Sequence, residues 1–304
     1  MPIIVPENLP AGEILQKKEN IFVMNSSRAI TQDIRPLKIA ILNLMPKKIE
    51  TELQFLRLLS NSPLQIDVHL VYTASYRPSH TSMEYLEKFY KTFDEIKYEK
   101  YDGMIITGAP VEKLPFEEVD YWEEMAKIMD WSKDHVFSTV FVCWAAQAAL
   151  YHFHGIEKEE LLDKLFGVFE HKITKQDDML KGFSDSFLIP HSRHTRVKED
   201  DVRACEDLQV LSESEDAGIY LIKSKKYNQF FITGHAEYDT ETLKNEYDRD
   251  VSQGQKIEIP KNYYENDDPS KPPKNCWRSN AYLQMSNWLN YYVYQITPYD
   301  INEI

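Results

Sequence analysis

The chain has 304 residues and carries 35 basic against 49 acidic side chains, for a formal net charge of −14. This length suits one large α/β domain or two small ones. The acidic balance argues against nucleic acid or an anionic membrane as the partner of the whole protein. A polyanionic co-substrate would need a local basic patch.

The cysteine content is low and shows no regular spacing. Cys143, Cys205 and Cys276 form neither a disulfide framework nor a zinc-ligand pattern, so we expect no metal site and a reducing, cytoplasmic setting. The N-terminus lacks a basic region followed by a long apolar stretch, so no signal peptide is expected. The most apolar stretch, 137–154, contains Ser, Thr, Gln and His and is too polar to span a bilayer.

The first half of the chain alternates short apolar strands with helices. Residues 1–36 show weak periodicity and are interpreted as an extension wrapped on the domain. The predicted strands are 38–44, 65–72, 103–107 and 138–142, and the predicted helices are 50–59, 83–93, 118–131 and 144–154. This order predicts an α/β fold of three layers, with a mostly parallel sheet covered by helices on both faces, as in flavodoxin-like proteins.

The second half is less regular. It contains predicted strands at 186–189, 208–211, 218–222 and 229–233, and predicted helices at 240–251 and 280–294. The loop 255–275 between the two helices is rich in Pro, Asn and Asp. We predict a single domain, divided into the extension 1–36, an α/β core 37–254 and a C-terminal loop and aromatic helix 255–304. The aromatic helix is expected to pack on its own sheet or on a second subunit, so a homodimer is possible.

Cys143 lies where the predicted strand 138–142 ends and a helix begins. A tight turn at this junction presents the sulfur outward, and the helix N-terminus favours a thiolate, so the position suits a nucleophile. The alternative is a small buried thiol without a chemical role, which is the usual fate of a free cysteine.

His235 and Glu237 follow another predicted buried strand. In extended chain, residues two apart point to the same side, about 6.5–7 Å from each other. A glutamate there can hold the tautomer of the imidazole while the second ring nitrogen faces a nucleophile. Taken alone, the pair could be a loop histidine beside a solvated acid. With Cys143 at a matching edge, a Cys-His-Glu triad is the favoured interpretation. His191 and His194 are interpreted as loop residues.

Polar residues follow two further strands of the predicted sheet. Lys47 and Lys48 come after the first strand and Glu112 comes shortly after the third. In parallel sheets ligands bind outside the carboxyl ends of the strands. We therefore expect Lys48, Glu112 and Cys143 at one edge of the sheet.

The chain resembles the homoserine O-acyltransferases of methionine biosynthesis, which are similar in fold to class I glutamine amidotransferases. The stretches that carry the resemblance are NLMPKKIETE (43–52), ITGAPVE (106–112), FVCWAAQAALY (141–151), KLFGVFEH (164–171), HSRHT (191–195), TGHAEYD (233–239), EYDRD (246–250) and NWLNYYVYQITPY (287–299). They extend over nearly the whole chain. The resemblance implies that Cys143 is acylated, that His235 is the general base and that Glu237 orients it.

The same resemblance assigns residues to the substrates. It implies that Lys164, Ser192 and Arg249 contact the amino acid, and the planar fork of Arg249 suits a carboxylate. Lys48 matches the lysine of the family's N-L-M-P-x-K stretch and is expected to line the site. The chain departs from the family at Ala236, where the family has proline, and at 277–282, where W-R-S-N-A-Y replaces W-R-S-H-G-N.

Members of the family differ in acyl donor, and the position occupied here by Glu112 is associated with that choice. A glutamate resembles the acetyl type and a glycine the succinyl type. A carboxylate facing the acyl pocket would repel the carboxylate of a succinyl group. The resemblance thus implies acetyl-CoA as co-substrate, no permanently bound cofactor, and ping-pong transfer to homoserine. The backbone N–H of Trp144 is expected in the oxyanion hole.

Three alternatives stay open at this point. The enzyme could use succinyl-CoA; the scaffold could carry a glutaminase or another amide hydrolase; or the chain could be a binding module that retained the fold. The turn at Cys143 lacks the flanking glycines expected of the amide hydrolases.

Overall fold

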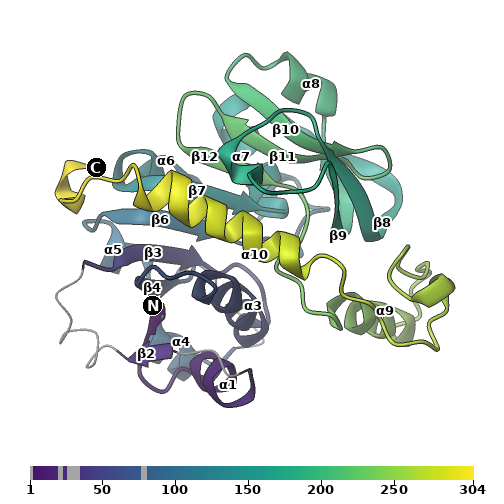
Figure 1. Ribbon diagram of the computed structural model, residues 1–304, viewed down its shortest axis with the longest axis horizontal. Coiled ribbons are helices and arrows are strands. Elements are labelled where there is room, and N and C mark those ends of the chain that lie inside the picture. Colours follow the sequence, from purple (N-terminus) through teal and green to yellow (C-terminus); the bar gives the residue numbers. More distant parts are fainter. Residues whose placement is uncertain (1–2, 20–22, 26–34, 77–80) are drawn as a thin grey trace.

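The structure is a computed structural model that describes residues 3–19, 23–25, 35–76 and 81–304 (Figure 1). Within these ranges it contains one 12-stranded sheet with the order β2-β1-β4-β3-β6-β7-β12-β11-β10-β8-β9, and β5 pairs with β4. Helices cover both faces. The predicted α/β class and mostly parallel central sheet are therefore confirmed.

The parallel part of the sheet carries the first half of the chain. Its strands are β1 (Ile3–Val5), β2 (Val23–Asn25), β3 (Leu37–Leu42), β4 (Ile66–Val71), β5 (Tyr90–Lys91), β6 (Tyr101–Ile106), β7 (Val136–Val142) and β12 (Gln229–Ile232). The central order β4-β3-β6-β7-β12 is that of a doubly wound, flavodoxin-like sheet. The chain moves from β3 to one side and then to the other, so the order reverses between β3 and β6.

Alternating side chains divide the core between the two faces of the sheet. Ile39 and Ile41 of β3 belong to one apolar cluster, whereas Ala40 and Leu42 belong to the other. The first cluster lies under α3 (Lys48–Ser60) and α10 (Arg278–Asn287); the second lies under α6 (Trp122–His135) and α7 (Trp144–His154). In β7 the same alternation places Phe141 against the second pair of helices. The period of two is that of an extended chain buried on both sides.

The second half continues the sheet with antiparallel strands. These are β8 (Lys158–Ile173), β9 (Ser186–Val197), β10 (Leu208–Ser214) and β11 (Gly218–Ser224). The sequence predicts no strand at β8, and it predicts a strand at 186–189 that is followed by a loop. In the structure β9 passes through Pro190, which pairs with Val168 of β8. As the last strand of the sheet, β9 can accommodate a residue without an N–H.

The N-terminal segment differs from the predicted extension. Strand β1 pairs in parallel with β4, and β2 adds to β1, so this segment lengthens the sheet. Helix α1 (Pro10–Lys18) lies between them in the chain and buries Leu15. Each strand has only three residues, too few to give a periodic signal in the sequence.

The C-terminal aromatic helix lies across β3, β6 and β7 of its own chain (Figure 1). It begins as α10 and continues as the π-helical segment η4 (Trp288–Tyr294). The indole N–H of Trp288 donates to Ser138 Oγ at 2.9 Å, which fixes the helix to β7. The packing choice left open by the sequence is thus settled in favour of the helix's own sheet.

The remaining helices are short or lie at the rim. They are α4 (Met83–Phe89), α5 (Phe93–Ile96), α8 (Glu199–Ala204), α9 (Thr242–Ser252) and the 3-10 turns η1 (Phe116–Glu118), η2 (Asp178–Leu180), η3 (Glu265–Asp267) and η5 (Ile301–Glu303). Helix α9 follows β12 and projects beside β8 and β9 (Figure 1).

Candidate active site

Cys143 occupies the sharp turn between β7 and α7. Its backbone has φ 52° and ψ −114°, and it is the N-cap residue of α7. A positive φ is costly for a residue with a side chain, and such conformations concentrate where a side chain must be presented at a strand-to-helix turn. Cys143 is 5% exposed. The nucleophile position predicted from the sequence is therefore matched by the local backbone.

His235 and Glu237 lie beside Cys143, because β12 is the parallel neighbour of β7 and pairs Ile232 with Val142. Nδ1 of His235 donates to Glu237 Oε1 at 2.7 Å, and the imidazole also hydrogen-bonds the Cys143 side chain. Burial acts to lower the pKa of His235, but the Cys143 thiolate and the Glu237 carboxylate outweigh it and raise the pKa well above 6.5. The three side chains thus have the order and contacts of a catalytic triad.

The loop after β6 passes close to Cys143. A Cβ at Gly108 would lie 3.2 Å from Cys143 Cβ and 3.6 Å from His235 Cε1, so only glycine leaves this approach open. On the other side, Trp144 is the first residue of α7, where backbone N–H groups have no acceptor within the helix. Its N–H is therefore available to an oxyanion formed on a thioester carbonyl.

Tyr238 connects the triad to a second polar cluster. Its ring stacks on His235 with a centroid separation of 4.2 Å, and its hydroxyl donates to Glu246 Oε1 of α9 at 3.0 Å. The other oxygen of Glu246 accepts from Ser192 Oγ on β9 and lies 3.4 Å from Lys164 Nζ on β8. Two of the residues predicted to contact the amino acid thus meet at one carboxylate.

Arg249, the third predicted amino-acid contact, lies next to this cluster. Its Nε donates to Asp250 Oδ1 at 2.7 Å, and the second oxygen of Asp250 lies 3.3 Å from Lys164 Nζ. The Arg249 side chain is 54% exposed, whereas that of Asp250 is 6% exposed. Arg249 and Lys164 therefore present two cations around one buried carboxylate, a geometry that suits a second carboxylate arriving from solvent.

Glu112 points into the protein and not into bulk solvent. Its Oε1 accepts the backbone N–H of His194 on β9 at 3.0 Å. Burial raises the pKa of Glu112 above 4.5, against the opposing fields of His235, Lys164 and Arg193. The carboxyl group is therefore within electrostatic range of His235 and Lys164.

His191 and His194 were interpreted as loop residues, and that interpretation was wrong. Both lie on β9, because the strand continues past Pro190. His191 also contacts a histidine of β8, His171. His171 Nδ1 donates to Phe169 O at 2.9 Å, so its Nε2 accepts from His191 Nε2 at 3.0 Å. Burial lowers the pKa of His171 to about 4 and that of His191 well below 6.5, so both rings are neutral. A Cβ at Gly234 would lie 2.9 Å from His191 Nε2. His191, and with it the neutral pair, thus packs against Gly234, the residue that precedes His235.

Lys48 begins α3 at the same edge of the sheet. The side chain is 5% exposed and its ammonium donates to the carbonyl of Asn43. Burial lowers the pKa of Lys48 to about 8, opposed by the carboxylate of Glu52. This predicted site residue is therefore a buried cation at the end of β3.

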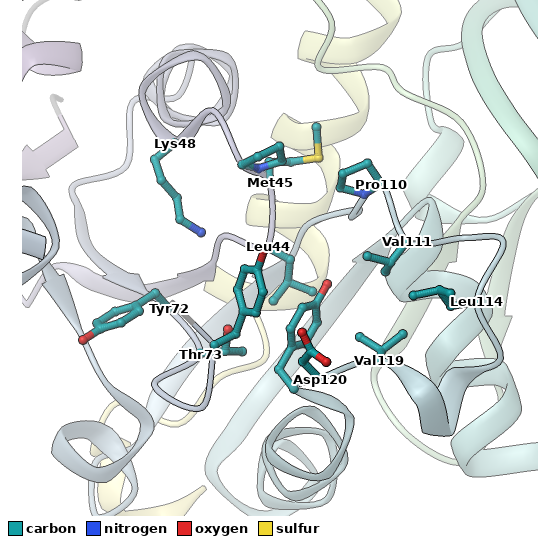
Figure 2. A pocket seen from close by; sticks show the side chains of 13 residues that line it. Leu44, Met45, Lys48, Tyr72, Thr73, Pro110, Val111, Leu114, Val119 and Asp120 are labelled. Carbon is teal, nitrogen blue, oxygen red and sulfur yellow. The ribbon is translucent and has the colours of Figure 1, made fainter. Parts of the chain in front are cut away.

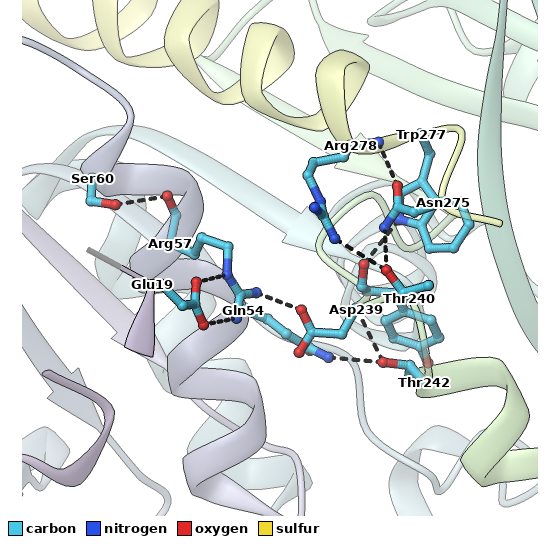
Figure 3. A network of polar contacts seen from close by, with 11 residues as sticks. Glu19, Gln54, Arg57, Ser60, Asp239, Thr240, Thr242, Asn275, Trp277 and Arg278 are labelled. Atoms are coloured by element: carbon cyan, nitrogen blue, oxygen red, sulfur yellow. Dashed lines mark hydrogen bonds and ion pairs between the residues drawn. The ribbon is translucent and has the colours of Figure 1, made fainter. Parts of the chain in front are cut away.

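The segment 239–242 is tied to two distant parts of the chain, α3 and α10 (Figure 3). Arg57 of α3 donates to both oxygens of Glu19, at 2.6 and 2.7 Å, and to Asp239 Oδ1 at 2.5 Å. Arg278 of α10 donates to Thr240 Oγ1 at 3.1 Å. These contacts fix the position of residues 239–242, which directly follow Glu237 and Tyr238 in the chain.

Replacing Arg57 with alanine is expected to lower the free energy of unfolding by about 1–3 kcal/mol, because two partly buried carboxylates then face each other without a cation. Urea unfolding measures the loss. The matched control is Arg196→Ala, which breaks an ion pair with Glu159 whose partners are 46% and 42% exposed, and should cost no more than about 0.5 kcal/mol. Equal losses in the two variants would contradict the structural role of Arg57.

The described residues contain neither a cluster of metal ligands nor a membrane-spanning helix. Over residues 3–19, 23–25, 35–76 and 81–304, no group of three or more His, Cys, Asp or Glu side chains is placed to hold a metal ion. None of the helices in the same ranges is long and apolar enough to cross a membrane.

The sequence of this chain matches a known family over almost its full length. The model of the homoserine O-succinyltransferase family matches residues 2–299. The chain belongs to this family of homoserine O-acyltransferases. It is 56% identical over 305 residues to the homoserine O-acetyltransferase of Acetivibrio thermocellus, with all of both chains covered. It is also 55% identical over 304 residues to that of Thermotoga petrophila, again with all of both chains covered.

Solved structures with the same fold are more distant in sequence. A glutamine amidotransferase from Thermotoga maritima aligns over 84% of this chain and 98% of its own, with a TM-score of 0.54 and 9% identity. One from Methylobacillus flagellatus aligns over 84% and 93%, with a TM-score of 0.51 and 10% identity. These likenesses concern the fold. The family membership identifies the chain as an acyltransferase, which confirms the enzyme class predicted from the sequence.

Sequence reasoning missed Tyr238 and Glu246 as members of the site. Both lie in stretches that carry the family resemblance, but neither has a chemical partner nearby in sequence. Glu246, Arg249 and Asp250 do lie three and four residues apart, which places them on one face of a helix. That spacing is the feature of the sequence that could have grouped Glu246 with Arg249 at the site.

Proposed function

We propose that this acyltransferase moves an acetyl group from acetyl-CoA to the hydroxyl of L-homoserine through a thioester on Cys143. The observation that carries the proposal is the Cys143–His235–Glu237 arrangement, in a chain 56% identical over its length to a homoserine O-acetyltransferase. Acetyl-CoA acts as co-substrate, with no permanently bound cofactor. Free, unpaired cysteines among the described residues support a reducing, cytoplasmic setting.

In the first half-reaction the Cys143 sulfur attacks the thioester carbonyl. The Trp144 backbone N–H lies at the helix N-terminus, where it stabilises the negative charge that forms on the oxygen. The imidazolium of His235 gives its proton to the departing thiolate of coenzyme A. One thioester replaces another, so this step is close to thermoneutral.

In the second half-reaction homoserine enters the vacated site. Neutral His235 removes the proton from the hydroxyl, and the oxygen attacks the acetyl carbonyl on Cys143. The Cys143 thiolate leaves, and the oxygen ester departs as product. Transfer from sulfur to oxygen is downhill, which drives the second step.

The amino acid is proposed to bind at the cluster on α9. Its carboxylate would lie between Arg249 and Lys164, which already surround the carboxylate of Asp250. Its ammonium would bind Glu246, a carboxylate that accepts from the Tyr238, Ser192 and Lys164 side chains and lies one ring away from His235. Tyr238 therefore links recognition of the amine to the base that acts on the hydroxyl.

Glu246→Gln is expected to raise the KM for homoserine between about tenfold and a hundredfold, because a charge-assisted contact to the ammonium is lost. Formation of the acetyl-enzyme from acetyl-CoA should be unchanged. Steady-state kinetics and a single-turnover acetylation assay measure the two quantities. The matched control is Asp248→Asn on the same helix, where the carboxylate is 51% exposed and pairs with Lys244. A loss of acetylation in Glu246→Gln would contradict the assignment.

A donor-by-acceptor assay tests the proposed function. Acetyl-CoA or succinyl-CoA is combined with homoserine or serine, and ester formation is measured for each of the four pairs. The proposal requires acetyl-CoA with homoserine to be the preferred pair. Hydrolysis of free glutamine with no activity on any acyl-CoA would instead identify an amide hydrolase on this scaffold.

A further inference from the structure

A cavity of about 150 Å³ opens at the carboxyl ends of β3, β4 and β6 (Figure 2). Its walls come from the loops that follow these strands and from the entry to α6. The lining residues are Leu44, Met45, Pro46, Lys48, Tyr72, Thr73, Tyr76, Pro110, Val111, Leu114, Val119, Asp120 and Tyr121.

The position of the cavity in the sheet is one where ligands bind. The strand order reverses between β3 and β6, and the loops after these two strands form opposite walls of the cavity. In doubly wound sheets the crevice at such a reversal lies outside the strand ends and is open to a ligand. The triad, by contrast, follows β7 and β12, further along the same edge.

The cavity is connected to the nucleophile through two contacts. The loop that places Pro110 in the cavity wall includes Gly108, where an added Cβ would lie 3.2 Å from Cys143 Cβ. One residue lies between Gly108 and Pro110, a span of at most about 7 Å, so the wall begins close to Cys143. On the other side, the ring of Tyr121 in the wall packs edge-on against Trp144, with centroids 6.0 Å apart.

The chemistry of the lining suits a thin, largely uncharged chain with amide groups. Most of the wall is aliphatic or aromatic, and Thr73 adds a hydroxyl. Figure 2 shows the ammonium of Lys48 directed toward the cavity, where it keeps donors beyond the one given to Asn43. Asp120 is exposed in the wall and disfavours phosphates there. An uncharged chain with amide groups fits this lining. If such a chain carries phosphates at one end, that end would lie outside the cavity.

Glu112 separates this cavity from the amino-acid cluster. Its neighbour Val111 lines the cavity, while its own carboxylate turns to the backbone of His194 on β9. Glu246 contacts Lys164 of β8 and Ser192 of β9, the strand that also carries His194. Two binding regions therefore approach Cys143 from different directions.

We propose that the cavity at the ends of β3, β4 and β6 receives the pantetheine arm of the acyl-CoA donor. This assignment rests on the proposed function and adds the location of the donor to it. The arm runs from the thioester at Cys143 past Gly108 and Pro110, and its amides meet Lys48 and Thr73. The nucleotide end stays at the protein surface. The amino acid enters on the α9 side, so the two substrates do not share contacts beyond the triad.

Leu114→Trp tests the assignment, because Leu114 lines the cavity. The residue is 43% exposed, so the larger tryptophan side chain can occupy the cavity without disturbing the core. We expect kcat/KM for acetyl-CoA to fall at least tenfold. In a ping-pong reaction kcat/KM for homoserine belongs to the acetyl-enzyme and should stay unchanged. The matched control is Ile296→Trp, at a residue that is 51% exposed and outside the cavity, which should change neither value. Thermal unfolding verifies that the variants are folded, and Val111→Trp provides a second variant should Leu114→Trp fail to fold.

Calorimetry with two unreactive probes gives an independent readout. Desulfo-coenzyme A, which keeps the arm, should bind Leu114→Trp at least tenfold more weakly than it binds the native protein. Adenosine 3′,5′-bisphosphate, which lacks the arm, should bind both equally. Unchanged desulfo-coenzyme A binding, or an equal fall in kcat/KM for both substrates, would overturn the assignment. Failure of the native protein to use any acyl-CoA would instead overturn the proposed function.

Discussion

Cys143→Ala is expected to lower the rate of acetyl transfer by at least about ten-thousandfold, the scale seen when the nucleophile of a triad is removed. The reason is that Cys143 supplies the sulfur that stands at the strand-to-helix turn and hydrogen-bonds His235. Alanine accepts the same backbone conformation about as readily as cysteine, so the fold should remain. The measurement is the initial rate of ester formation from acetyl-CoA and homoserine.

Cys205→Ala is the matched control for the loss of a thiol. Cys205 is half-buried, and its sulfur lies 3.7 Å from Nδ1 of His154, the last residue of α7, whereas Cys143 is the N-cap residue of that helix. Its replacement should leave the rate within about twofold of native, since surface-side substitutions of this kind change little. An active Cys143→Ala enzyme, or an inactive Cys205→Ala enzyme that is correctly folded, would show that the nucleophile has been assigned to the wrong residue.

Glu112→Gly is expected to shift the ratio of kcat/KM for acetyl-CoA to that for succinyl-CoA by about a hundredfold toward succinyl-CoA. Two carboxylates about 4 Å apart repel by roughly 4 kcal/mol at a protein-surface dielectric. The expected shift is smaller than this bound, because burial raises the pKa of Glu112 and nearby cations offset its charge. Competition between the two donors at equal concentration measures the ratio directly.

Glu112→Gln separates the charge of this residue from its volume. Glutamine keeps the size and can still accept the N–H of His194, but it does not repel a second carboxylate. If charge decides donor choice, glutamine should give most of the shift seen with glycine. If volume decides, glutamine should behave as glutamate does. An unchanged donor preference in both variants would remove Glu112 from any role in selecting the donor.

The parallel half of the fold was predictable because its strands are short apolar runs that alternate with helices. Strand β7 and helix α7, for example, are separated at Cys143 by a clear change in composition. The antiparallel half could not be predicted in the same way, because β8 contains many charged residues and β9 contains Pro190. Strand β1 was missed because a strand of three residues is too short to show a periodic pattern in the sequence. Its pairing with β4 is a tertiary contact.

The triad could be predicted from the sequence because each member follows a strand of a parallel sheet, and strand ends converge at one edge. The place of Glu246 in the site could not be predicted, because its contacts with Ser192 and Lys164 depend on how α9 packs against β8 and β9. The cavity at β3 and β6 was also beyond sequence reasoning, because three loops and the entry to α6 form it together. Lys48 was predicted to lie at the site, but its burial appears only in the structure.

Acetyl transfer to the enzyme without an acceptor tests the central claim most directly. Native protein is mixed with acetyl-CoA in a stopped-flow instrument with no homoserine present, and free coenzyme A is followed; the acetylated peptide is then identified by mass spectrometry. The account predicts a burst of one equivalent of coenzyme A per active site, with the acetyl group on Cys143. A preparation that forms ester when homoserine is added, yet gives no burst and no acetylated Cys143, would contradict it.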